Sequence, residues 1–153
     1  MKVHRKADQF IFELAKREQD ILLGLLRLYP CTPAATPSGP EKKSEKIPAS
    51  SQRLLEEALT EQRATNKLQV QAFVTEKGRF QTTEHGAKLT LSSSEFEWLL
   101  QILNDVRIGS WIRLGSPEQK KELAYLNKNT APHFWAMEAA GHFEMALLAA
   151  LDL

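Results

Sequence analysis

The chain has 153 residues, 42% of them hydrophobic and 25% charged, which is typical of a globular protein and excludes a wholly disordered or fibrous one. Its 20 lysines and arginines nearly balance 19 aspartates and glutamates, so a formal charge of +1 gives no overall field that would attract nucleic acid or anionic lipid. Cys31 is the only cysteine, which excludes an intramolecular disulfide and a zinc cage of thiolates from one chain.

The first 29 residues predict a strand and a first helix. Phe10, Phe12 and Leu14 alternate with other residues as in a strand, and Leu22, Leu25 and Leu26 then take helical spacing to about Tyr29. Pro30 ends this helix, because proline lacks the backbone donor that a helix interior needs. His4 is expected to face water in a tail before the strand.

Residues 30–50 predict a flexible linker, since they hold five of the seven prolines and almost nothing that can be buried. Within this linker Cys31 is expected to be an accessible thiol, although no neighbouring base is evident to activate it. The spacing of Leu55, Leu59, Val70 and Phe73 favours one long helix over residues 51–75, ended by Gly78. A strand over residues 68–72 remains the alternative.

Residues 79–83 and 87–91 flank the polar turn Glu84-His85-Gly86 and predict a hairpin. Two segments of the chain are similar to each other: residues 12–18 and 89–95 both have the pattern of a strand, a turn and a helix start. We therefore expect these two strands to pair beside the hairpin in a small sheet, with their helices on one face.

The remaining sequence predicts helices. Ser94 and Glu97 form a capping box before an apolar helix that ends at Gly115, and a shorter helix through Leu123 and Leu126 follows. Thr130 as the cap and Pro132 in the first turn begin a last helix to about Leu151. This last helix is apolar nearly all round, so it is expected in the core or in a subunit interface.

The predicted fold is therefore one α+β domain that is mainly α-helical, a helical bundle with a small antiparallel sheet or hairpin. Residues 1–29 supply the strand and first helix, residues 30–50 the linker, and residues 51–153 the main helical body. Charged residues interrupt the only region resembling a leader, and the most apolar run, Met145–Leu151, is too short to span a bilayer. A cytoplasmic protein without a membrane segment is predicted.

The segments Trp98–Arg107 and Trp111–Gly115 resemble the most recognisable stretch of an uncharacterised bacterial family of unknown function. In actinobacteria, genes of that family commonly lie beside the gene for the adaptor of the Clp protease. The resemblance extends to the helix around Glu18 and Leu22 and to residues 144–151. The proline-rich linker and Gly109-Ser110-Trp111 depart from the family pattern, which indicates a divergent branch. The resemblance implies no established activity.

Six residues of the last two long predicted helices are candidate structural or interaction residues. They are Asn104, Asp105, Arg107, Trp111, Glu138 and Glu144. Asp105 and Arg107 are two positions apart and so do not face each other on a helix, which requires partners from residues such as Glu18, Glu138 or Glu144. A structural network that fixes how helices dock is the favoured interpretation, and a ligand or catalytic role is the alternative.

No catalytic residue, metal site or cofactor is predicted. His133, Glu138, His142 and Glu144 carry possible metal ligands, but their spacing matches no strong zinc motif. Gly109 and Gly141 are expected to let two helices approach closely, so a larger side chain at either should lower the melting temperature.

The favoured function is a non-enzymatic protein-interaction or regulatory domain that binds another protein, or itself, through the apolar last helix. A DNA-binding transcriptional regulator is the first alternative, because Ser116-Pro117-Glu118 joins two predicted helices by a short turn. The helix after this turn mixes Lys120 and Lys121 with Glu122, so its charge argues against nucleic-acid binding. A metal-assisted enzyme is the further alternative.

Overall fold

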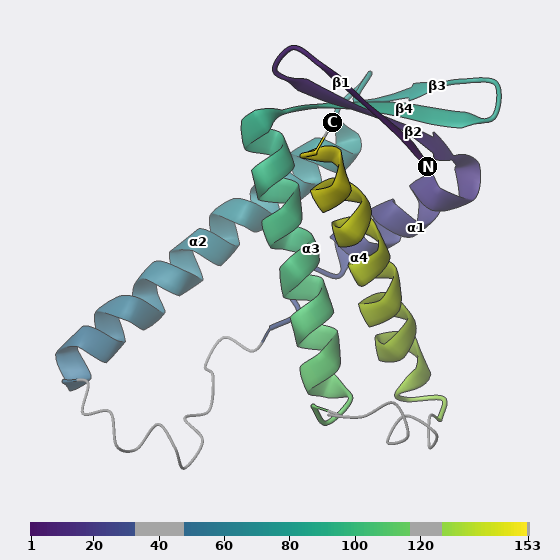
Figure 1. Ribbon diagram of the computed structural model, residues 1–153. Coiled ribbons are helices and arrows are strands. Elements are labelled where there is room, and N and C mark those ends of the chain that lie inside the picture. The colour runs from purple at the N-terminus through teal and green to yellow at the C-terminus, as the bar shows by residue number, and fades with distance from the viewer. Residues whose placement is uncertain (33–47, 117–126, 153) are drawn as a thin grey trace.

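The computed structural model describes residues 1–32, 48–116 and 127–152. A four-stranded antiparallel sheet lies at one end of the molecule, three helices pack beneath it, and a fourth helix projects from the body (Figure 1). The elements are β1 (Lys2–Lys6), β2 (Gln9–Ala15), α1 (Lys16–Arg27), α2 (Ala49–Thr75), β3 (Phe80–Thr82), β4 (Gly86–Ser92), α3 (Ser93–Arg113) and α4 (Ala131–Ala150). The predicted α+β class with mainly helical content is confirmed.

The prediction for residues 1–29 is confirmed for β2 and α1 but missed β1. His4 does not lie in a tail: it sits in β1 opposite Ile11 of β2, with its Nε2 3.5 Å from Oε2 of Glu13. Only Val3 of this edge strand is partly buried, so β1 carries no apolar alternation that would reveal it in the sequence.

The long helix and the hairpin are also confirmed, with shifted ends. Residues 68–72 belong to α2, so the alternative strand is wrong, and Gly78 lies in the turn to β3 with a φ of +83° rather than at the helix end. The predicted capping box at Ser94 is wrong by two positions. Ser92 accepts from the backbone N–H of Glu95, whose carboxylate accepts from that of Ser92 in return.

Two predicted segments are only partly described. Residues 33–47 of the linker and the predicted helix through Leu123 and Leu126 lie outside the described residues. Pro132 stands in the first turn of α4 as expected, but the hydroxyl of Thr130 accepts from the N–H of Asn127 instead of capping the helix. Gly115, with a φ of +90°, follows the end of α3 as predicted.

The chain is built from two halves with the same order of elements, strand, strand, helix, helix. The strands β2 and β4 begin at Gln9 and Gly86, 77 residues apart, and the same separation relates Lys16 and Ser93, where α1 and α3 begin. The sheet order β1-β2-β4-β3 places the two hairpins side by side, with β2 against β4 at the centre. The similarity between residues 12–18 and 89–95 is thus part of a structural repeat that covers both halves.

The buried residues follow the same repeat. Nine pairs of buried hydrophobic residues are separated by 77 positions: Phe10 and Ala87, Phe12 and Leu89, Leu14 and Leu91, Leu22 and Leu99, Leu25 and Ile102, Leu26 and Leu103, Tyr29 and Val106, Val70 and Leu147, and Phe73 and Ala150. Most of the core therefore consists of one hydrophobic pattern used twice, with the two copies related by a local two-fold axis through the sheet.

The halves differ in the lengths of their first helices. α1 has 12 residues and stops before Pro30, whereas α3 continues for 21 residues. α4 packs along α3 through Ala136, Ala140, Phe143 and Leu147, which are spaced at four, three and four residues and are all buried. Among the described residues no helix packs along the whole length of α2, and its first half extends away from the body (Figure 1).

Candidate functional site

Asp105 fixes the turn that follows α1. Its Oδ1 accepts from the backbone N–H groups of Cys31 at 2.6 Å and Thr32 at 3.3 Å, and its Oδ2 accepts from the Thr32 hydroxyl. The Thr32 hydroxyl oxygen in turn accepts from Nη2 of Arg63 on α2 at 2.8 Å. This carboxylate therefore ties α3 to the turn and, through Thr32, to α2.

Cys31 is enclosed by this turn, so the expected accessible thiol is wrong: the residue is 6% exposed. Its Sγ donates to the carbonyl of Leu28 at 3.1 Å. Burial raises the pKa of the Cys31 thiol to about 11, with the negative charge of Asp105 adding to the effect and Arg113 opposing it. A thiol in this state is a weak nucleophile at neutral pH.

Arg107 lies in a second polar cluster. Its Nε donates to Oε1 of Glu144 on α4 at 3.1 Å, and its Nη2 donates to Oδ1 of Asn104 at 3.0 Å. The predicted partner Glu144 is therefore present, whereas Glu18 accepts from the N–H of Ala15 and Glu138 is exposed. Three of the candidate residues thus meet in one cluster that links α3 to α4, while Asp105 belongs to the other cluster.

Trp111 stands next to the Arg107 cluster but is not a core residue. It is 37% exposed and lines a hollow of about 290 Å³ together with Arg107, Ile108 and Met137. The hollow opens between α3 and α4. The lining thus combines an aromatic ring, a guanidinium group and two apolar side chains.

The outer face of α4 exposes large apolar side chains. Trp135, Met145 and Leu148 are 67%, 74% and 51% exposed, whereas Ala140, Phe143 and Leu147 on the inner face are buried. Glu138 and His142 occupy the same outer face between Trp135 and Met145. The last helix is therefore apolar nearly all round, as predicted, but only half of its circumference is covered by the core.

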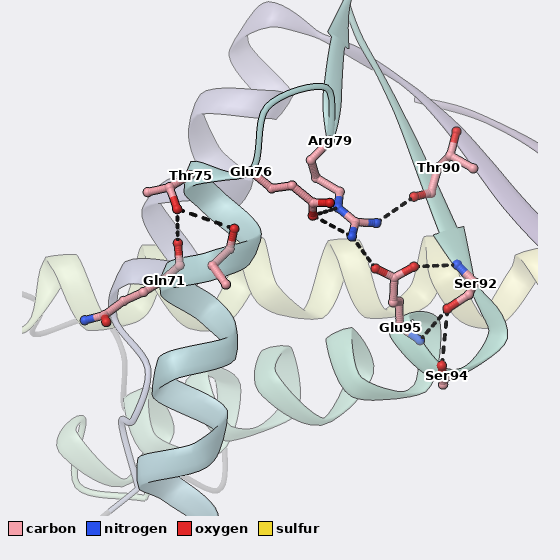
Figure 2. Close-up of polar contacts among 9 residues, drawn as sticks. Gln71, Thr75, Glu76, Arg79, Thr90, Ser92, Ser94 and Glu95 are labelled. Atoms are coloured by element: carbon pink, nitrogen blue, oxygen red, sulfur yellow. Dashed lines mark hydrogen bonds and ion pairs between the residues drawn. The ribbon is translucent and has the colours of Figure 1, made fainter.

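Arg79, which the sequence analysis did not single out, joins four elements (Figure 2). Its guanidinium contacts the carboxylates of Glu76 at 2.7 Å and Glu95 at 2.5 Å, donates to the carbonyl of Thr90 at 3.2 Å, and lies 5.0 Å from the ring centroid of Phe73. The end of α2, the start of β3, β4 and the start of α3 are thereby held together. The residue pairs with partners up to 16 positions away, so sequence periodicity offers no signal for it.

The contacts in this cluster stabilise the ionised carboxylate of Glu95. Burial raises the pKa of its carboxyl. The hydrogen bonds from the Ser92 N–H, Arg79 and the Ser92 hydroxyl together lower this pKa by a larger amount, so the net pKa lies below its usual value. Arg79 is affected in the opposite sense: burial lowers its pKa, and the two glutamates raise it to a net higher value. Both groups are therefore charged at neutral pH.

Among residues 1–32, 48–116 and 127–152, no three histidine, cysteine, aspartate or glutamate side chains lie close enough together to hold a metal ion. His133, Glu138, His142 and Glu144 are thus not brought together as a ligand set in the described structure. Within the same ranges, no helix is both long and apolar enough to cross a membrane.

Comparison with known proteins adds no relative, since no family model, curated protein or solved structure matches the chain.

Proposed function

We propose that this protein is a non-enzymatic interaction protein of the bacterial cytoplasm that binds another protein along the outer face of α4. The observation that supports this proposal is the exposure of Trp135, Met145 and Leu148 on a helix whose opposite face is buried. Tryptophan and methionine are enriched in protein interfaces, and tryptophan is among the residues that contribute most of the binding free energy.

The outer face of α4 has the rigidity that such a surface needs. Ala136, Ala140, Phe143 and Leu147 hold the helix in the core, and the 3.1 Å contact between Glu144 and Arg107 fixes it against α3. A preformed surface loses little conformational entropy on binding. Glu138 and His142 separate the apolar side chains and can orient a partner through polar contacts.

The experiment is affinity capture of the tagged full chain from a lysate of its native cells, followed by mass spectrometry at two salt concentrations. The test variant is Trp135→Glu/Met145→Glu. The matched control is Leu54→Glu/Leu68→Glu, in which two equally exposed apolar residues of α2, both 67% exposed, receive the same charges. The resemblance to a family encoded beside the Clp adaptor makes proteases and their adaptors the first partners to look for.

A protein captured by the wild type and the control but lost with the α4 variant would support the proposal. Capture of nothing, or of proteins that the α4 variant retains, would contradict it. Recovery of nucleic acid that is lost at high salt would instead favour the DNA-binding alternative.

A further inference from the structure

One face of α2 corresponds to the buried face of α4. A shift of 77 positions converts Ala136, Ala140, Phe143, Leu147 and Ala150 of α4 into Leu59, Arg63, Asn66, Val70 and Phe73 of α2. All five α4 residues are buried. On α2 only Val70 and Phe73 are buried, at 5% each, whereas Leu59 is 41% exposed. The face that packs along its whole length in the second half is therefore covered at only one end in the first half.

The uncovered part of this face lies on the N-terminal side of Arg63 and Asn66, the first residues of α2 that contact the rest of the described structure. Asn66 donates to the hydroxyl of Tyr29 at 3.2 Å and Arg63 donates to Thr32 at 2.8 Å, so the second part of α2 is anchored. Every residue from 49 to 62 is exposed. The cause is the short α1: it ends at Arg27 before Pro30, so the first half has no counterpart of the last turns of α3.

We call this exposed segment the α2 arm (residues 49–62). It presents apolar side chains at helical spacing to the solvent. Leu55 and Leu59 continue the line of Asn66, Val70 and Phe73 at helical spacing and are 54% and 41% exposed. The arm is roughly 20 Å long at 1.5 Å per residue. The arm continues the anchored part of the 27-residue helix α2, and a packing partner would add the tertiary contacts that supply most helix stability in proteins.

We propose that a second copy of this chain covers the α2 arm, through antiparallel pairing of the two arms about a two-fold axis near Leu59. Such a contact is isologous, because each arm presents the same face to the other. The pairing places Leu59 against Leu59, on the same face of α2 as Val70 and Phe73, which belong to the core. It supplies the cover that α3 gives to α4 within one chain.

The charges of α2 suit an antiparallel arrangement. Toward the free end of the arm Glu56 and Glu57 outweigh Arg53, and toward the body Arg63 and Lys67 outweigh Glu61. With Leu59 at the axis, Glu56 of one arm comes next to Arg63 of the other, and the same pair recurs on the opposite side of the axis. A parallel pair would instead place like charges together, which opposes association.

The test uses sedimentation equilibrium of the full chain at several micromolar concentrations. The wild type is expected at twice the mass of one chain, and Leu55→Glu/Leu59→Glu is expected at the mass of one chain with an unchanged helical circular dichroism spectrum. Leu54→Glu/Leu68→Glu, on the same helix, and Trp135→Glu/Met145→Glu, on α4, should both remain dimeric. The inference concerns a different surface from the proposed function, so either can fail alone.

A pair of single-cysteine substitutions tests the register without disturbing the fold. Leu59→Cys should give a disulfide-linked dimer under mild oxidation, whereas Leu68→Cys, half a turn around the helix, should not. Cys31 is buried and does not interfere. A monomeric wild type, a dimer that survives Leu55→Glu/Leu59→Glu, or the absence of a disulfide-linked dimer in the Leu59→Cys variant would overturn the proposal. A monomer in which Leu59→Cys resists alkylation would assign the cover to this chain's own residues 33–47.

Discussion

Phe12 and Leu89 lie directly opposite each other at the centre of the antiparallel pair β2–β4. They also occupy equivalent positions in the two halves of the chain, so the local two-fold axis passes between them. Both are almost completely buried, at 2% and 1% exposed. The contact between the two halves is therefore the middle of the hydrophobic core, and neither half has a complete core by itself.

Replacement of Phe12 by alanine tests the importance of this position. Removing a buried phenylalanine costs about 3–5 kcal/mol through lost transfer free energy and the cavity left behind. We expect a loss of that size in urea unfolding of Phe12→Ala. Val3→Ala, in the partly buried edge strand β1, should cost much less. Equal losses for the two variants would argue against a core centred on the β2–β4 pair.

Asp105→Ala should lower stability more than its position near the surface suggests. The change leaves the N–H groups of Cys31 and Thr32 without their acceptor, and each unsatisfied buried group costs about 1–3 kcal/mol. We expect a clear fall in the melting temperature measured by differential scanning calorimetry. Asn104→Ala, which removes one exposed contact with Arg107, is the control and should change it little. Similar melting of both variants would refute the role assigned to Asp105.

The thiol of Cys31 should react slowly in the folded protein. Its pKa of about 11 leaves very little thiolate at neutral pH, and burial blocks the reagent. Alkylation by iodoacetamide should therefore be much slower than in urea and should accelerate with rising pH up to the raised pKa. Rapid modification of the native protein at neutral pH would show that the turn after α1 opens readily.

Gly109 is expected to tolerate no side chain, whereas two other helical glycines should accept one. A Cβ atom at Gly109 would clash with the backbone of Cys31, while one at Gly24 meets nothing within 4 Å and one at Gly141 meets only Arg107 at 3.7 Å. Gly109→Ala should thus lower the melting temperature by several degrees. Gly24→Ala and Gly141→Ala should leave it unchanged or raise it, since alanine favours a helix over glycine by about 1 kcal/mol. The expectation that Gly109 permits close packing is met, but the partner is the turn after α1 and not a helix. At Gly141 a Cβ atom makes only an ordinary contact, so the same expectation stays a prediction for side chains larger than alanine.

The Arg79 cluster should make stability depend on pH in the acid range. The pKa of Glu95 is lower in the folded protein than its ordinary value of 4.5, so its contribution is present above pH 4.5 and is lost as the pH falls through the folded pKa. The melting temperature of the wild type should fall below pH 4.5 more steeply than that of Glu95→Gln. Melting temperatures of the two proteins that fall in parallel from neutral pH into the acid range would contradict this assignment.

Much of the fold could be predicted because its signals are local. The alternation of Phe10, Phe12 and Leu14 and the helical spacing of Leu99, Leu103 and Val106 are set by the geometry of a strand and a helix, which any window of the sequence displays. The similarity between residues 12–18 and 89–95 is also visible in the sequence. It predicted two equivalent strands, and these pair as β2 and β4.

The tertiary structure decided the features that depend on distant partners. β1 pairs with β2 although most of its own residues are polar, and Asp105 finds backbone donors 73 and 74 positions earlier in the chain. Arg79 contacts one carboxylate just after α2 and another in the first turn of α3. Every residue except proline has a backbone N–H group, so the sequence does not indicate which of these groups a distant side chain will bind. The exposure of Leu59 is decided in the same way: its spacing predicts a buried face, and only the early end of α1 beside it leaves that face uncovered.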